Sequence, residues 1–175
     1  MSLNIPQTLY PLAFTVGIAG QVVDSAMGTE IVSRVVAAGA NIPAGSFTVR
    51  SSTDGLVKLP TSAAEMQRPE GVALYQPGRR PGSYGSALPD GSTLPEGVPV
   101  LRKGRIWVYS EVLVTKGDPV FVRHTVHGGL SVLGVFRNDA DTVTGSDTAA
   151  QLDGAEFAAT TTGSGLAPID VNLPG

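Results

Sequence analysis

The sequence predicts an all-β fold, a β-barrel or β-sandwich with little helix and an extended N-terminal arm. The chain has 175 residues, of which 22 are glycine and 13 are proline, and only 15% are charged, against about 25% in an average soluble domain. Short apolar segments alternate with turn signals that recur about every 8 to 12 residues, as in barrels and sandwiches. A hydrophobic content of 42% supports one globular core. We therefore expect an arm at residues 1–20 and a single β-rich domain at residues 21–175.

The first 20 residues are uncharged and apolar, and Pro6, Pro11, Gly17 and Gly20 break both helical and strand periodicity within them. Such a segment is costly to leave in water, so we expect an extended arm that lies against its own core or a neighbouring subunit. An ordinary first strand is the alternative. The large apolar side chains of the arm are candidate contact residues: Leu3, Ile5, Leu9, Tyr10, Leu12 and Phe14.

Residues 29–38 are the best helix candidate, because Thr29 can cap a helix there. The same segment is rich in valine and isoleucine, so a strand is an equal alternative. Residues 47–51 alternate in polarity, and the Asp54-Gly55 turn precedes a second apolar segment at residues 56–59. This pattern predicts a β-hairpin.

A short strand is expected at residues 71–75, followed by a long loop at residues 76–97 that is dense in proline, glycine and serine. We expect this loop to form no regular element. Loops of this length in a compact domain are usually functional or flexible, and we interpret this one as a binding loop. Arg79 and Arg80 are its candidate contact residues, with a solvated loop as the alternative.

The strongest strand signal predicts a three-stranded meander between residues 98 and 126. Turns are expected at Lys103-Gly104 and at residues 116–118. Both faces of the strand at residues 106–114 carry apolar side chains, so we expect this sheet to be covered on both sides. Further strands are expected at 130–136, 156–162 and 166–173, with a polar break at 138–147.

Three cations surround the first turn of the expected meander. Arg102, Lys103 and Arg105 are candidates for pairing with an acidic surface of another protein. A solvated turn is the alternative.

The bulk properties argue against several classes of protein. A net charge of −3 and a pI of about 5.3 argue against nucleic-acid binding, which needs clustered lysine and arginine. The chain has no cysteine, so it has no disulfide or thiolate metal site. No apolar stretch approaches the ~18 residues of a membrane span. The first basic residue is Arg34, so we expect no secretion signal and a mature protein that begins near Met1.

Reactive side chains are few and show no catalytic pattern. His124 and His127 fall on opposite faces of a strand, and half-exposed strand-end histidines are the favoured interpretation. Asp139, Asp141 and Asp147 lack the spacing of an EF-hand loop and are interpreted as ordinary loop carboxylates. The chain contains no G-x-S-x-G, Walker or G-x-G-x-x-G sequence. We therefore expect no enzyme activity, no cofactor and no metal.

The order of several short motifs resembles the phage structural cement protein family. Its elements correspond here to Asp24, Ser33-Arg34, Ile42-Pro43 with Gly45, Gly71-Val72-Ala73, the sheet from Val98, and Val171-Asn172-Leu173. The resemblance covers the chain from about Gly20 to its end.

The resemblance implies a virion structural protein made in the host cytoplasm that binds the outside of an assembled capsid and cements adjacent major capsid subunits. It implies a homotrimer with the major capsid protein as partner, and no active site. The β-rich domain is then the capsid-binding domain. Two alternatives stay open: a tail-fibre, head-fibre or host-surface adhesin that binds through the loop at 76–97, and a cupin-like barrel enzyme that uses His124 or His127.

Overall fold

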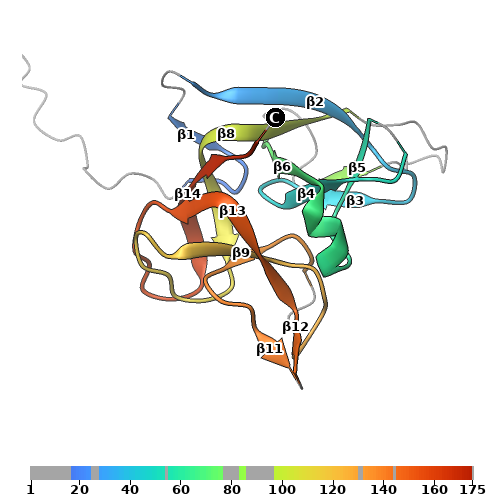
Figure 1. Ribbon diagram of the computed structural model, residues 1–175. Helices are drawn as coiled ribbons and strands as arrows, with labels where there is room; N and C mark the ends of the chain where they lie inside the picture. Colours follow the sequence, from blue (N-terminus) through green and yellow to red (C-terminus); the bar gives the residue numbers. More distant parts are fainter. Residues whose placement is uncertain are drawn as a thin grey trace, which may run out of the picture.

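The computed structural model describes residues 17–24, 28–53, 55–76, 83–85, 97–129, 132–143 and 145–174. These residues form an all-β structure with one short 3-10 helix, so the predicted fold class is confirmed (Figure 1). The elements are β1 (Val22–Asp24), β2 (Glu30–Val36), β3 (Asn41–Pro43), β4 (Phe47–Arg50), β5 (Leu56–Lys58), η1 (Ala63–Gln67), β6 (Pro69–Ala73), β7 (Ser83–Gly85), β8 (Gly97–Ser110), β9 (Pro119–Arg123), β10 (Phe136–Arg137), β11 (Thr142–Val143), β12 (Ser146–Asp147), β13 (Ala149–Phe157) and β14 (Gly165–Asn172).

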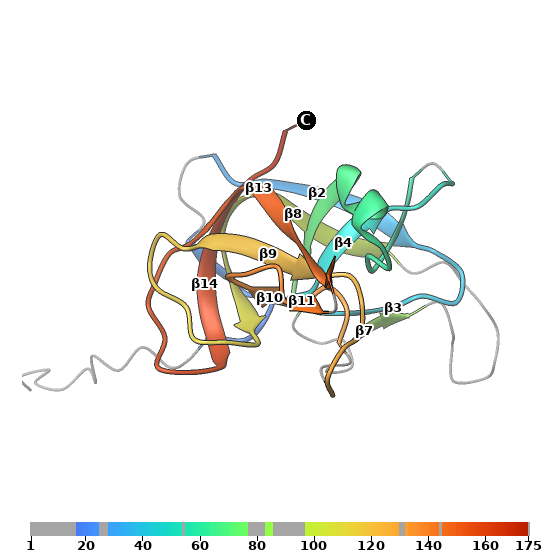
Figure 2. The same cartoon turned by 60° about the horizontal axis from the view of Figure 1, so that its bottom comes forward.

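The 14-residue strand β8 belongs to two closed rings of strands. Its C-terminal half pairs with β14, and the order β14–β13–β9–β10 returns to β8 through the pairing of Phe136 with Ser110. This closes a five-stranded barrel (Figure 2). Its N-terminal half pairs with β2, and the order β2–β5–β4–β6 returns to β8 through the pairings of Val72 and Ala73. Figure 1 shows this second ring, in blue and green, above and to the right of the orange and red barrel strands.

Gly71 allows the second ring to close. A Cβ atom at this position would lie 2.2 Å from the carbonyl oxygen of Leu101, which is a backbone atom that cannot move aside cheaply. The φ angle of Gly71 is 141°, a conformation that other residues rarely adopt. The close approach of β6 to β8 therefore depends on a glycine here.

The buried apolar residues form two clusters, and the larger cluster spans both strand rings. It combines second-ring residues such as Phe47 and Leu101 with barrel residues such as Ile106, Val122 and Phe136. The rings of Phe47 and Phe136 meet edge to face at 6.4 Å between centroids, a favourable aromatic geometry. The two rings of strands are thus packed against each other as a single body.

Several local strand predictions agree with the structure, but the strand expected at residues 130–136 is wrong, because of its described residues only Phe136 lies in a strand, β10. Residues 30–36 form the strand β2, which decides between the helix and strand alternatives for that segment. The expected hairpin is present as the antiparallel pair β4 and β5. The last two strands, β13 and β14, pair antiparallel as expected, but β13 spans Ala149–Phe157 and shares only its last two residues with the strand predicted at 156–162.

The predicted meander is wrong in two respects. Lys103 and Gly104 lie inside β8 and pair with β14, so the chain does not turn there. The following strand β9 pairs with β13 and β10 instead of β8. Residues 111–118 carry the chain from one side of the barrel to another, and β13 and β14 fill the space between β8 and β9. Long-range pairing has therefore overridden the tendency of consecutive strands to be neighbours.

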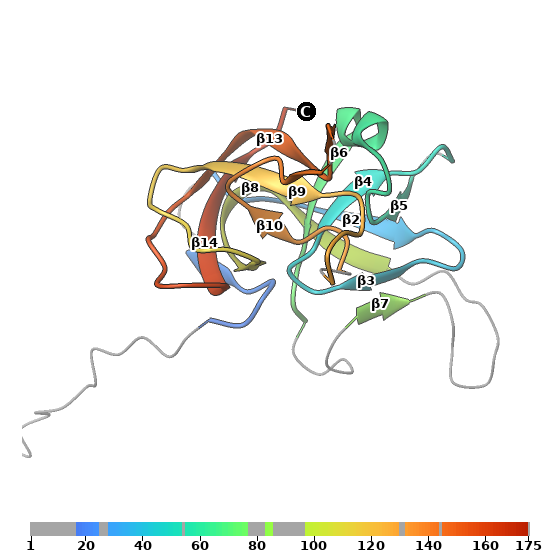
Figure 3. The same cartoon turned by 90° about the horizontal axis from the view of Figure 1, so that it is seen from below.

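The loop predicted to lack regular structure contains one short strand. Residues 83–85 form β7, which pairs antiparallel with β3 as a separate two-stranded sheet (Figure 3). Arg79, Arg80 and most of that loop lie outside the described residues. Within the described residues, no helix has the length and apolar character needed to cross a membrane.

Candidate functional site

The last residues of the predicted arm are anchored on the barrel. Gly17 is buried against the indole of Trp107, and a Cβ atom at Gly17 would lie 2.3 Å from that ring. The amide of Gly20 donates to the carbonyl of Trp107 at 2.7 Å, and the carbonyl of Gly20 accepts from the amide of Tyr75 at 2.8 Å. Residues 17–20 are thus an integral part of the folded body. The six candidate arm residues, Leu3, Ile5, Leu9, Tyr10, Leu12 and Phe14, lie outside the described residues, so their role stays a prediction.

The three cations predicted at a sheet turn lie within β8 and differ in environment. Arg102 is only 8% exposed, and its guanidinium donates to the carbonyl of Pro174. Arg105 binds Asp170 with two hydrogen bonds, of 2.7 and 2.6 Å. Lys103 is exposed. Two of the three cations are therefore engaged within the protein, and sequence reasoning missed this because it placed them at a turn.

The strand at residues 106–114 was expected to be covered on both faces, and this expectation is wrong for one face. Ile106 and Val108 are fully buried, as expected, but Tyr109 on the opposite face is 47% exposed. Two more apolar side chains near this strand, Ile18 and Val23, are exposed at 51% and 40%. Exposed apolar surface is a common mark of contact with another protein. We therefore include these three residues among the candidate contact residues.

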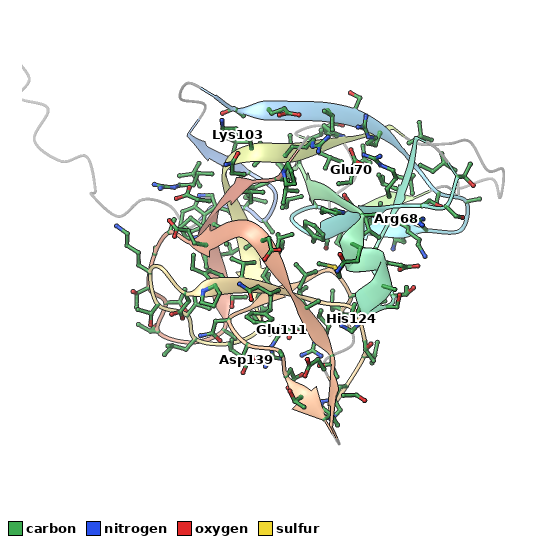
Figure 4. The ribbon with its side chains drawn as sticks, in the orientation of Figure 1. Arg68, Glu70, Lys103, Glu111, His124 and Asp139 are labelled. Carbon is green, nitrogen blue, oxygen red and sulfur yellow. The ribbon has the colours of Figure 1, made fainter. Side chains whose placement is uncertain are left out.

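A network of charged side chains lies beside β9 and β10, and most of its members are buried or half-buried (Figure 4 labels Glu111 and Asp139). Its members are Glu111, Arg123, Arg137, Asp141 and Asp139, of which Asp139 is exposed. Arg123 is fully buried and donates to Glu111 and to Asp141, each at 2.7 Å. Arg137 contacts Asp141 at 2.9 Å. The hydrogen bond from Arg123 holds the pKa of Asp141 below its ordinary value. The acids thus converge on two arginines, and the network joins β9, β10 and the loops beside them.

The two histidines have different surroundings. His127 is half-exposed and lies 3.8 Å from Asp141, in line with the prediction. His124 is buried, so the prediction is wrong for this residue, and burial lowers the pKa of its imidazole. Its Nδ1 lies 2.9 Å from the hydroxyl of Thr125. In the part of the chain that the structure describes, no three of the His, Asp and Glu side chains are grouped to hold a metal ion.

Comparison with known protein families identifies the family of this chain. The family model described as "Structural cement protein (E217 gp24/Pam3 gp6)" matches residues 5–172. The chain belongs to the phage structural cement protein family. This cement protein is therefore a non-enzymatic structural component of the virion that associates with the capsid. The resemblance drawn from its motifs is confirmed.

A solved structure shows the same fold. A chain of the structure described as "The capsid of Myoviridae Phage XM1" is similar to the cement protein with a TM-score of 0.68 and 17% sequence identity. The match covers 98% of this chain and 97% of that chain. At this identity the likeness extends to the fold alone. No protein with a curated description matches the sequence.

Proposed function

We propose that the cement protein binds the outside of the assembled capsid and clamps adjacent major capsid subunits, as a homotrimer. The observation that carries the proposal is the family match, which spans residues 5–172 of the 175. A clamp gains strength from avidity, because the first contact makes each later contact intramolecular. In a cyclic trimer every contact is repeated three times, so modest individual interfaces add up to a strong attachment.

The shared core supports this role. A clamp must hold its contact surfaces at fixed positions, and close-packed interiors resist deformation. Two strand rings joined through β8 and through the contact of Phe47 with Phe136 supply such a body. The exposed apolar residues Ile18, Val23 and Tyr109 are available for contact with a neighbouring subunit.

Cosedimentation with undecorated shells tests the proposed function. The wild-type protein is expected to pellet with shells and to saturate them at a fixed ratio to the major capsid protein. Mass measurement of the free protein in solution is expected to give three times the chain mass of 17.9 kDa. A protein that stays in the supernatant at all shell concentrations would refute the function, and a monomer or dimer would refute the trimer alone.

We also propose that residues 2–16 bind a capsid subunit or a sister protomer by strand addition or by filling a groove. The structure supports a specific truncation, because residues 17–20 are anchored on Trp107 and Tyr75 and should be kept. A variant that lacks residues 2–16 is expected to keep its unfolding temperature and to lose occupancy on shells, measured by cosedimentation.

A second variant separates the two kinds of arm contact. Serine in place of the six apolar arm residues keeps the backbone but removes the side chains that would fill a groove. Strand addition predicts that this variant retains part of the occupancy lost in the truncation, because main-chain hydrogen bonds remain. Unchanged occupancy of the truncated protein would show that the arm makes no contact of consequence.

A further inference from the structure

A pocket rich in arginine opens beside η1, at the end of β4 and next to the C-terminal segment. Its volume is about 490 Å³. Arg50, Arg68 and Arg102 line it, together with Ser51, Ser52 and Gln67. All six side chains carry hydrogen-bond donors, and three of them are permanently cationic. The pocket is therefore suited to an anion.

The carboxylates near the pocket do not neutralise its three cations. The buried Glu70 is shared between two arginines, at 2.7 Å from Arg34 and 3.0 Å from Arg50. Arg68 is exposed, and no carboxylate of the described residues forms an ion pair with it. Figure 4 shows Arg68 and Glu70 on the same side of the molecule, away from Glu111 and Asp139. An excess of positive charge thus remains at this pocket.

Arg102, which lines the pocket, also carries a buried donor that makes no hydrogen bond. Its side chain is more than nine-tenths buried, and its Nε atom has no hydrogen-bond partner in the described structure. A carboxylate oxygen of Glu30 lies 3.8 Å from this atom, which is close enough for an ion pair but too far for a hydrogen bond. A buried donor without an acceptor is costly, and native proteins rarely leave one without a reason.

We propose that this pocket receives an acidic side chain of a neighbouring capsid protein when the cement protein sits on the shell. Guanidinium groups bind carboxylates through paired, charge-assisted hydrogen bonds, and the serine hydroxyls and the glutamine amide offer further donors. The volume exceeds that of one carboxylate, so it admits a whole acidic side chain with part of its backbone. The choice of a protein partner rests on the proposed function, since a capsid subunit is the surface this protein would meet.

Charge reversal at Arg68 tests the inference. Arg68→Glu is expected to lower the affinity for undecorated shells by at least about tenfold, because it places a like charge against the incoming carboxylate. Lys116→Glu is the matched control, because Lys116 is an exposed cation on the turn before β9 and the net charge changes equally. The control is expected to bind shells like the wild type. Arg68→Gln, which removes the charge without reversing it, is expected to fall between the two.

Zero-length crosslinking identifies the source of the carboxylate. In Arg68→Lys the new amine can be coupled to a carboxylate in direct contact by a carbodiimide. A crosslink from position 68 to an aspartate or glutamate of the major capsid protein is expected. A crosslink to a second copy of this chain would overturn the proposed partner. Loss of shell binding in millimolar inorganic phosphate, with no crosslink, would assign the pocket to a free oxyanion and overturn it as well.

The two proposals fail in different ways. If the wild type does not cosediment with shells, the proposed function is wrong. If the wild type binds and Arg68→Glu binds equally well, the function stands and the pocket inference is wrong. Equal unfolding temperatures of wild type and variants exclude misfolding as the cause of any loss.

Discussion

Replacing Arg123 with methionine is expected to destabilise the cement protein by about 3 kcal/mol. Breaking a buried ion pair by removing one partner typically costs about 3–5 kcal/mol, because the other charge is left without compensation. Arg123 is fully buried, and its guanidinium donates to Glu111, Asp141, Thr125 and Thr148. Methionine fills a similar volume but satisfies none of these acceptors.

The surroundings of Glu111 and Asp141, the two acids that lose Arg123 as a partner, decide where in that range the loss of stability falls. The side chain of Glu111 is 4% exposed and that of Asp141 is 22% exposed, so solvent screens the second acid better than the first. Arg137 stays within 3.3 Å of Glu111 and 2.9 Å of Asp141 and compensates part of the lost charge. These two facts place the cost near the lower end. For a domain of this size, about 3 kcal/mol corresponds to a drop of roughly 6–12 °C in Tm.

Thermal and urea unfolding, followed by circular dichroism, measure the loss. Arg105→Met is the control, because its ion pair with Asp170 is 46% and 38% exposed and should contribute less than about 1 kcal/mol. The double variant Glu111→Met with Arg123→Met is expected to recover part of the stability, because it removes both members of the most buried pair. A loss in Arg123→Met no larger than in the control, or strict additivity in the double variant, would refute this account of the network.

Two further predictions concern backbone strain and acid sensitivity. Gly71→Ala is expected to lower the free energy of unfolding by at least about 2 kcal/mol, and Gly117→Ala by about 1 kcal/mol. Both glycines have positive φ, but only Gly71 lies against another backbone segment. Urea unfolding compares the two variants, and equal losses would contradict the close approach of β6 to β8. Burial lowers the pKa of His124 below its ordinary value of 6.5, so the unfolded chain binds more protons and stability falls as the pH drops below about 6.5. His124→Asn is expected to flatten the pH dependence of unfolding between pH 7 and pH 5; an unchanged slope would show that this histidine does not contribute to it.

The sequence predicted elements whose signals are local. The hairpin of β4 and β5 was found because a turn dipeptide separates two alternating segments, and both signals lie within a dozen residues. The meander failed because strand pairing is a long-range property. Nothing near Lys103 and Gly104 indicates that β14, some seventy residues later, will pair across them and keep β8 continuous.

The prediction of contact residues from the sequence was limited by the same dependence on long-range strand pairing. Arg102 and Arg68 are both arginines beside turn-like sequence, but one is buried behind the C-terminal segment and the other is exposed. Burial depends on which distant strands pack against a position. The pocket was therefore out of reach of sequence reasoning, because Arg50, Arg68 and Arg102 come from three separate segments. The composition did indicate an interaction protein, since a low charge content is visible without any structure.

Two residues of β8 mark the two proposed contacts, because Trp107 holds the anchored end of the arm at Gly17 and Arg102 lines the pocket. Their positions bear on how a clamp of this kind would work. Trp107 and Arg102 are five residues apart on one strand, which is at most about 17 Å. Residues 1–16 could extend at most about 55 Å from the base at Gly17, which is ample to pass beyond one contact footprint. If both proposals hold, the pocket fixes the body on one subunit while the arm reaches another. The strain between the two contacts would then be carried by β8, which is hydrogen-bonded on both edges by strands of both rings.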